Sequence, residues 1–106
     1  MLKHTENISK GIELRRKRNI YVINIKLNIE SCHYCNRKVN EDNHMAFHFD
    51  HLDPLEKNEG ISVLVNSTYA SEAIISKEID KCQLLCANCH RIRTLEQFGF
   101  CQYLIL

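Results

Sequence analysis

Two pairs of cysteines constrain the fold of this 106-residue chain more than any other feature. Cys32 and Cys35 form one pair, and Cys86 and Cys89 form the other, with two residues between the members of each pair. A two-residue gap lets one tight turn present both sulfurs to the same ion, and tetrahedral zinc needs four such soft ligands. Fifty residues separate the two pairs, so a shared ion would join distant segments and contribute directly to folding. The spacing therefore predicts a structural zinc ion held by all four thiolates.

Three other uses of these cysteines fit the sequence less well. A redox Cys-x2-Cys site needs a strand–helix–strand context, and it leaves one pair unexplained. A finger with two cysteines and two histidines would add His44 and His48, or His48 and His51, to the first pair, and both choices have the wrong gaps. Disulfides are disfavoured because the N-terminus lacks a hydrophobic signal core, which favours the reducing cytoplasm. We expect the remaining cysteines, Cys82 and Cys101, to be small buried hydrophobic residues.

The net charge of +1 hides an uneven distribution. Residues 1–29 carry seven lysines and arginines against two glutamates, a balance of +5, whereas residues 30–106 balance to −4. A basic segment beside a mildly acidic body is typical of a chain that attracts a polyanion, although a solvated helix face has the same composition. No apolar run approaches the roughly 18 residues that a membrane helix needs, so we expect no membrane partner. We divide the chain into a basic N-terminal arm, residues 1–29, and one domain, residues 30–106.

Apolar periodicity predicts two short strands in this domain. Residues 45–51 alternate, with two phenylalanines on one face and His48 and Asp50 on the other, until Pro54 ends the strand. Residues 83–85 can form the second strand.

Helical spacing occurs in up to three further segments. Residues 69–81 and residues 88–98 both fit helices, and Gly99 is expected to stop the second. Residues 8–29 fit either a strand or one face of a helix, and periodicity alone does not decide between them. The tail over residues 98–106 is apolar enough that we expect it to pack on the body or on a partner. The predicted apolar faces consist of Ala70, Ala73, Ile74 and Ile79 in the first helix and of Ile92, Leu95 and Phe98 in the second.

A second group of polar residues lies beside the cysteines in the sequence. Asp50 and His51 end the first strand, and His90 directly follows the second cysteine pair. Asp50 and His51 can converge only where the strand breaks, and Asp53 with Pro54 supplies such a break. A carboxylate and an imidazole would leave positions open on a divalent ion, and a second imidazole could act as a base near neutral pH. From spacing alone, the simpler interpretation is a strand-end aspartate with an incidental histidine.

Three ordered stretches of the chain resemble the HNH endonuclease family. They span about 63 residues in the family's order, and the Cys-Ala-Asn-Cys-His segment is especially similar to small phage and bacterial members. The three stretches are Cys32-x2-Cys35, then Phe49-Asp50-His51-x-x-Pro54, then Leu84-Leu85-Cys86-x2-Cys89-His90-Arg91-x-Arg93-Thr94.

This resemblance implies an α+β fold with a ββα-metal core. The strands would lie near residues 45–51 and 82–85, a basic helix would precede them at residues 9–29, and residues 55–81 would add a further helix. The four cysteines would hold structural Zn²⁺. In the family's pattern, Asp50 and His90 would hold a catalytic Mg²⁺ or Mn²⁺, while His51 would deprotonate the water that attacks a phosphodiester.

The resemblance also implies that DNA is the partner and that the chain acts in the cytoplasm, which is the host cytoplasm for a phage protein. A homodimer or a larger phage or host assembly would fit a body of this size. His48 shares the strand face of Asp50 and would border the site. The residues expected to contact DNA phosphates are Arg15, Arg16, Lys17, Arg18, Arg91 and Arg93.

The chain departs from the family pattern at one position. The middle asparagine usually lies about five residues before the second cysteine pair, where this chain has Lys81. Asn58, Asn66 or Asn88 would then substitute, or a backbone carbonyl would orient His51. Two alternatives to an independent nuclease remain, namely a non-catalytic zinc module that binds nucleic acid and a subunit that cuts only within a larger assembly.

Overall fold

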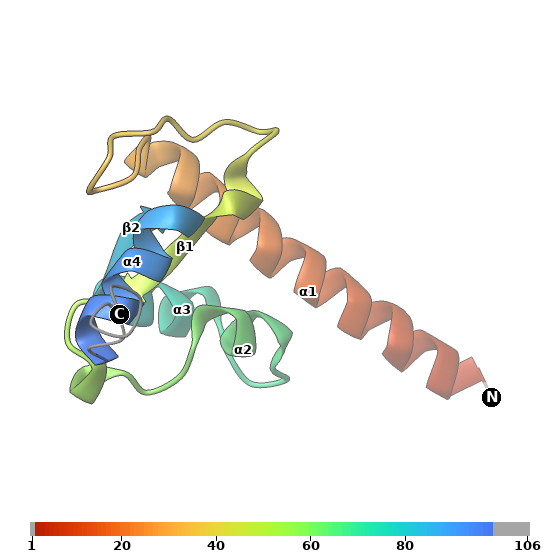
Figure 1. Ribbon diagram of the computed structural model, residues 1–106. Helices are drawn as coiled ribbons and strands as arrows, with labels where there is room; N and C mark the ends of the chain where they lie inside the picture. Colours follow the sequence, from red (N-terminus) through yellow and green to blue (C-terminus); the bar gives the residue numbers. More distant parts are fainter. Residues whose placement is uncertain (1, 99–106) are drawn as a thin grey trace.

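A two-stranded sheet with helices on both sides forms the body of the protein (Figure 1). The structure is a computed structural model that describes residues 2–98, and it describes side chains over residues 10–97. Within this part, two single-turn 3₁₀ helices, His44–Ala46 and Pro54–Glu56, flank the first strand. The main elements in chain order are α1 (Leu2–Ile29), β1 (Phe47–His51), α2 (Ile61–Asn66), α3 (Glu72–Ile79), β2 (Cys82–Cys86) and α4 (Ala87–Phe98).

β1 and β2 pair antiparallel, with Phe47 opposite Cys86 and His51 opposite Cys82. Both predicted strands are therefore confirmed, although β1 begins at Phe47 because His44–Ala46 forms a turn. The register places the end of β2, and with it the second cysteine pair, beside the start of β1. α4 follows β2 directly and corresponds to the predicted helix over residues 88–98.

The segment whose periodicity was ambiguous forms a helix, α1. Val22 is buried on its inner face, with Tyr21 and Ile25 packed beside it, which is the spacing of a helix stripe rather than of a strand. Glu30 ends the helix with a positive φ of 78°, and its backbone N–H donates to the Lys26 carbonyl at 3.1 Å. The C-terminal half of α1 thus packs on the body, while its N-terminal half projects away from it (Figure 1).

Residues 55–81 form two helices where a single helix over residues 69–81 is expected. α2 ends at Asn66, and Ser67 then folds back, with its hydroxyl donating to the Leu64 carbonyl at 2.7 Å. α3 begins only after Ser71, whose hydroxyl accepts the Ile74 N–H at 3.3 Å. α2 is therefore an additional helix before the predicted one, and the Ser71 cap starts α3 later than the predicted start at residue 69.

The predicted apolar faces of α3 and α4 are partly wrong. Ile75 is buried, whereas Ile74 is 43% exposed and Ala73 is also exposed. In α4, Ile92 is exposed and Leu95 is only half-buried. Gly99, Cys101 and the apolar tail lie outside the described residues, so their predicted roles stay predictions.

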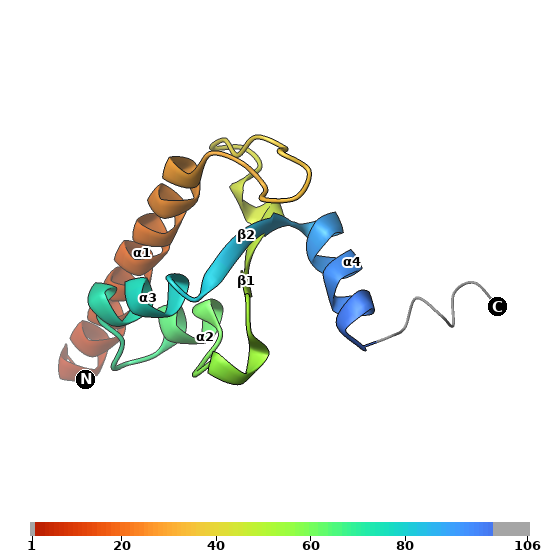
Figure 2. The ribbon, with the colours of Figure 1, turned by 90° about the vertical axis from the view of Figure 1, so that its left-hand side faces the viewer.

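Two hydrophobic clusters hold the body together. The first joins α1, α2 and α3 around Val22, Leu64 and Ile75, and the second joins the cysteine segment to the hairpin around Phe47 and Leu85. Phe49 packs against both clusters. Figure 2 shows α4 on one side of the hairpin and α1 with α2 and α3 on the other. Among the described residues, no helix has the length and apolar character needed to cross a membrane.

Candidate functional site

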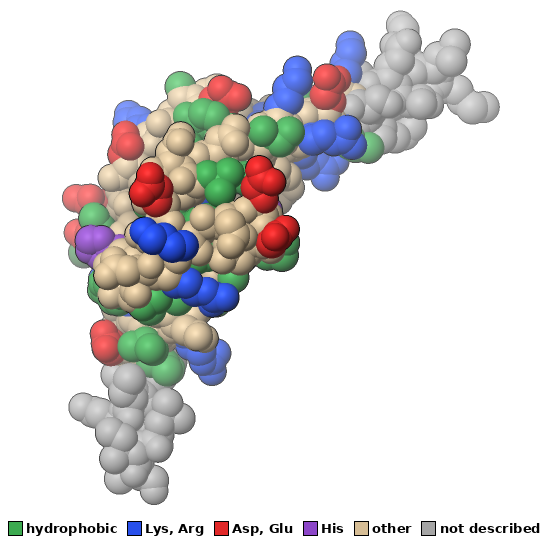
Figure 3. Space-filling model, turned by 90° about the horizontal axis from the view of Figure 1, so that it is seen from above, with side chains coloured by type: hydrophobic (Ala, Val, Ile, Leu, Met, Phe, Trp, Pro, Cys, Tyr) green, Lys and Arg blue, Asp and Glu red, His purple; other side chains and the backbone are tan. Residues whose placement is uncertain are grey.

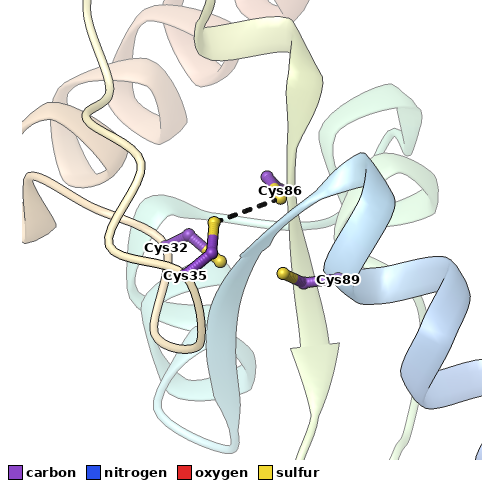
Figure 4. Close-up of side chains that lie close together, drawn as sticks. All are labelled: Cys32, Cys35, Cys86 and Cys89. Carbon is purple, nitrogen blue, oxygen red and sulfur yellow. Dashed lines mark hydrogen bonds between the residues drawn. The ribbon is translucent and has the colours of Figure 1, made fainter.

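The four predicted cysteines converge at one end of the hairpin (Figure 4). The sulfurs of Cys32, Cys35, Cys86 and Cys89 all lie within 4.8 Å of one another, and the Cys35 and Cys86 sulfurs are 3.7 Å apart. Zinc–sulfur bonds of about 2.3 Å in a tetrahedron separate neighbouring sulfurs by about 3.8 Å. The cluster could therefore hold a metal ion such as zinc.

Local hydrogen bonds bring the first cysteine pair to the second. The backbone N–H of Asn36 donates to the Cys32 carbonyl at 3.0 Å, and Asn36 has a positive φ of 62°, which closes a tight turn. The backbone N–H of His33 then donates to the Leu84 carbonyl at 2.8 Å, which fixes this turn against β2. Cys86 ends β2 and Cys89 lies in the first turn of α4, so the second pair spans a strand-to-helix junction.

The thiols of this cluster favour a cation between them. Burial disfavours the Cys32 thiolate, but backbone N–H groups of Cys35, Cys86 and Tyr34 outweigh it and lower the pKa of Cys32 to about 6. Burial and the neighbouring sulfurs raise the pKa of Cys89, because a second thiolate beside the first is unfavourable. A divalent cation removes this conflict by stabilising every thiolate at once.

The other described cysteine, Cys82, has a different environment. Its thiol donates to the Glu78 carbonyl at 3.4 Å, and burial, together with Glu78 and Asp50, raises its pKa to about 11. It is half-buried, in line with the small hydrophobic residue that we expect. None of the described cysteines forms a disulfide.

Asp50 and His90 meet on the α4 side of the hairpin. Asp50 is buried, with Oδ1 3.5 Å from His90 Nε2 and Oδ2 3.3 Å from Gln83 Nε2. Arg93, one turn beyond His90 on α4, places its Nε 2.5 Å from Asp50 Oδ2. The Arg93 N–H does not point at that oxygen, so the contact is an ion pair rather than a hydrogen bond.

His48 also reaches this group. It lies two residues before Asp50 on the same strand face, and its Nδ1 is 3.0 Å from His90 Nδ1, with the two rings edge to face. Burial, followed by the charges of His90 and Lys26, lowers the pKa of His48. The lowered pKa favours the neutral form of His48, whose Nδ1 can donate or accept the hydrogen bond to His90 Nδ1 depending on its tautomer.

His51 lies on the opposite face of β1 from Asp50, because the regular strand includes residue 51 and breaks only after this residue. The expected convergence of Asp50 and His51 is absent from the structure. The His51 Nε2 atom instead lies 2.7 Å from Glu78 Oε1 on α3, and both side chains are buried. Only the backbone of His51 faces Arg93, whose Nη2 is 3.5 Å from its carbonyl.

Two of the six predicted phosphate contacts do not fit that role. Arg18 is buried, and its Nη1 donates to the carbonyls of Val65 and Ser67, which ties α1 to the end of α2. The Arg93 guanidinium is used by Asp50, by the Tyr34 hydroxyl at 3.0 Å and by the Leu52 carbonyl at 2.9 Å. The remaining four, Arg15, Arg16, Lys17 and Arg91, are exposed.

Three neighbours of the site were not predicted from the sequence, namely Glu78, Gln83 and Tyr34. Glu78 follows Ile75 by three residues on the buried stripe of α3, but the predicted face of this helix does not include Ile75, so only the structure shows that Glu78 is buried. Gln83 is the partner of Asp50 across the sheet, which only the strand register reveals. Nothing in the sequence pattern indicates Tyr34, since it lies in the cysteine turn and meets α4 only in the folded chain.

Comparisons with protein-family models, curated proteins and solved structures find no match for this chain. The fold and the site define a small α+β protein in which, over the described residues, four helices surround a two-stranded antiparallel sheet. Its most distinctive feature is a four-cysteine cluster that could bind a metal ion such as zinc.

Proposed function

We propose that this protein is a metal-dependent DNA endonuclease of the HNH type. The observation that carries the proposal is the 3.5 Å approach of Asp50 and His90 on a hairpin and helix that the four-cysteine cluster joins. The two side chains come from positions 40 residues apart in the sequence and are the pair that the HNH resemblance selects.

Zinc at the cysteine cluster would be structural in this proposal. Four thiolates fill a tetrahedral shell and leave no position for water or substrate. Its role is to join the segment after α1 to the junction of β2 and α4, and thereby to hold His90 against β1.

The separation of Asp50 and His90 suits ligands of one divalent ion. Two ligand atoms about 2.1 Å from a shared ion lie about 3.0 to 3.4 Å apart in octahedral or tetrahedral geometry, close to the observed 3.5 Å. Asp50 Oδ1 and His90 Nε2 would hold the ion. Bound there, Mg²⁺ or Mn²⁺ would stabilise negative charge on the phosphate and the leaving oxygen.

The chain's own contribution is a base. His51 would take a proton from water as the water oxygen bonds to phosphorus, and the bond from phosphorus to the 3′-oxygen would break. The leaving oxygen would gain a proton from solvent, which gives 5′-phosphate and 3′-hydroxyl ends. Because the His51 side chain is buried on the far face of β1 from Asp50, the scissile phosphate would have to approach at the end of the strand.

Basic side chains on α1 and around a cavity beside His90 would supply attraction for DNA. Lys and Arg side chains line the part of α1 that projects from the body, as Figure 3 shows. A cavity of about 380 Å³ between α1, β1 and α2 also borders His48 and His90, and Lys26 and Lys57 line it. Phosphate contacts of this kind position DNA without reading its sequence.

Plasmid cleavage tests the proposal. Supercoiled plasmid would be incubated with the zinc-loaded protein and Mg²⁺ or Mn²⁺, beside His51→Ala, His90→Ala and the control His33→Ala. We expect nicked or linear product from the wild type and the control, and a loss of at least about 100-fold in both other variants, with DNA binding retained. Equal background from wild type and His51→Ala would refute catalysis.

One observation favours a second function, a non-catalytic zinc module that binds nucleic acid. Arg93 already neutralises Asp50, so the carboxylate has a protein partner without any ion. In that case, DNA would bind with a salt-dependent affinity. Neither the wild type nor variants of Asp50, His51 or His90 would cut the plasmid.

A further inference from the structure

A buried carboxylate lies on α3, outside the group that the proposed chemistry uses. The Glu78 side chain is only 5% exposed, and it lies on the stripe of α3 that also carries Ile75 and Ile79. An apolar residue would fill this place without the cost of removing a charge from water. The contacts of this buried carboxylate therefore indicate its role.

Three donors converge on this carboxylate. His51 Nε2 is 2.7 Å from Oε1, the backbone N–H of Asn58 donates to Oε1 at 3.0 Å, and Lys81 Nζ donates to Oε2 at 3.0 Å. Burial alone would raise the pKa of Glu78, but the hydrogen bonds from Lys81, His51 and Asn58 outweigh it and lower the pKa to about 2. Glu78 is therefore ionised at neutral pH and can only accept hydrogen bonds.

The ionised carboxylate determines which His51 nitrogen carries the proton. Because Glu78 cannot donate, His51 Nε2 must be the N–H donor of the 2.7 Å contact. In the neutral ring, the lone pair is then on Nδ1. Within the described residues, Nδ1 makes no hydrogen bond, and the His51 residue keeps 8% of its surface exposed.

Lys81 links this arrangement to the one position where the chain departs from the HNH pattern. It occupies the place of the expected asparagine, and none of Asn58, Asn66 and Asn88 bonds to the His51 ring within the described residues. Lys81 contacts Glu78 instead, with its Nζ also donating to the Glu56 carbonyl at 3.1 Å.

We propose that Glu78, supported by Lys81, is the positioning residue for His51: it holds the ring with Nε2 protonated and leaves Nδ1 as the atom that accepts the proton of the attacking water. This proposal rests on the nuclease function proposed above. Glu78 does not touch the substrate, and its effect on cleavage acts through the tautomer and orientation of His51.

Nitrogen NMR of the histidine rings in the zinc-loaded wild-type protein tests the tautomer directly, whatever the protein's activity. We expect the Nε2–H form of His51, with the Nδ1 signal of an unprotonated nitrogen. A predominant Nδ1–H form would overturn the proposal, and so would a ring that averages freely between both forms.

Two matched variants on α3 test the role in cleavage. In Glu78→Gln, the amide can donate as well as accept, so the Nε2–H preference should weaken, and kcat should fall at least about 10-fold with KM within about twofold. Glu72→Gln makes the same chemical change at an exposed position of α3 and should alter neither quantity.

The outcomes separate this proposal from the proposed function. If the wild type does not cut DNA but shows the Nε2–H form that Glu78→Gln loses, the nuclease function fails while Glu78 still orients the ring. If the wild type cuts and Glu78→Gln retains both its tautomer and its kcat, the positioning role is wrong while the nuclease stands. Should Glu78→Gln fail to fold, the wild-type spectrum alone decides the tautomer.

Discussion

Individual basic residues of α1 differ in role although they are neighbours in the sequence. Arg16 is exposed, whereas Arg18 is only 8% exposed and donates to two backbone carbonyls at the end of α2. The charge of the segment is a property of its composition, but the partner of each charge depends on which helix face it occupies. α1 therefore uses one of its arginines for packing and leaves others for solvent or a polyanion.

Replacing these two arginines separates stability from binding. Arg18→Ala removes a cation from one buried and one part-buried carbonyl and should lower the free energy of unfolding by about 1.5 to 3 kcal/mol. Arg16→Ala should change it by less than about 0.5 kcal/mol. Urea unfolding of both variants measures the difference.

For DNA binding, we expect the larger effect from Arg16→Ala rather than from Arg18→Ala. If Arg16 contacts a phosphate, Arg16→Ala reduces the slope of log affinity against log salt by about 1. Equal unfolding free energies for the two variants would show that the Arg18 contacts do not stabilise the fold.

At the level of elements, α3 positions Glu78 and depends on a single cap. Ser71 accepts the Ile74 N–H at 3.3 Å, and the eight-residue helix is too short to form in isolation. Its stability comes from this cap and from packing of Ile75 and Ile79 on α1 and α2. Loss of the cap at Ser71, the residue before α3, can therefore affect the site at the far end of the helix.

Ser71→Ala should cost about 1 kcal/mol, since it leaves the first turn of α3 without its side-chain acceptor. The control is Ser76→Ala, within the same helix, whose hydroxyl caps nothing in the described structure and which should be neutral or slightly stabilising. Thermal unfolding monitored by circular dichroism compares them. A Ser76→Ala variant as unstable as Ser71→Ala would rule out the capping explanation.

At the scale of the whole molecule, the cysteine cluster joins two segments that lie 51 residues apart in the sequence. It connects the loop after α1 to the β2–α4 junction, and the small cluster around Phe47 and Leu85 packs against it. Zinc binding to structural sites supplies roughly 10 to 16 kcal/mol, as much as the entire stability of many domains. We expect folding of the hairpin and α4 to depend on the metal.

Chelation should therefore abolish the cooperative thermal transition or lower its midpoint strongly, and added Zn²⁺ should restore it. The measurement is a melt under reducing conditions with and without a chelator. An unchanged melt of demonstrably metal-free protein would contradict a structural role.

Matched cysteine variants supply the control for this experiment. Cys86→Ser removes a ligand and should lower the zinc content measured by elemental analysis. Cys82→Ser, at the other end of the same strand, lies outside the cluster and should retain about one zinc per chain.

The sequence by itself determined the cysteine cluster, the two strands and the helix after them, because these features depend on spacing over a few residues. The tertiary structure decided which side chains meet. His51 and Glu78 are 27 residues apart, Arg18 reaches a carbonyl 47 residues away, and Tyr34 reaches Arg93 across 59. The direction in which a side chain points follows from strand alternation and helix rotation. Only the packed chain therefore decided three features, namely the inner face of α3, the separation of Asp50 from His51 and the helical state of α1. Short spacing in the sequence specifies the two cysteine ligands that one turn presents. The burial of apolar faces against one another decides which partners the other polar groups meet.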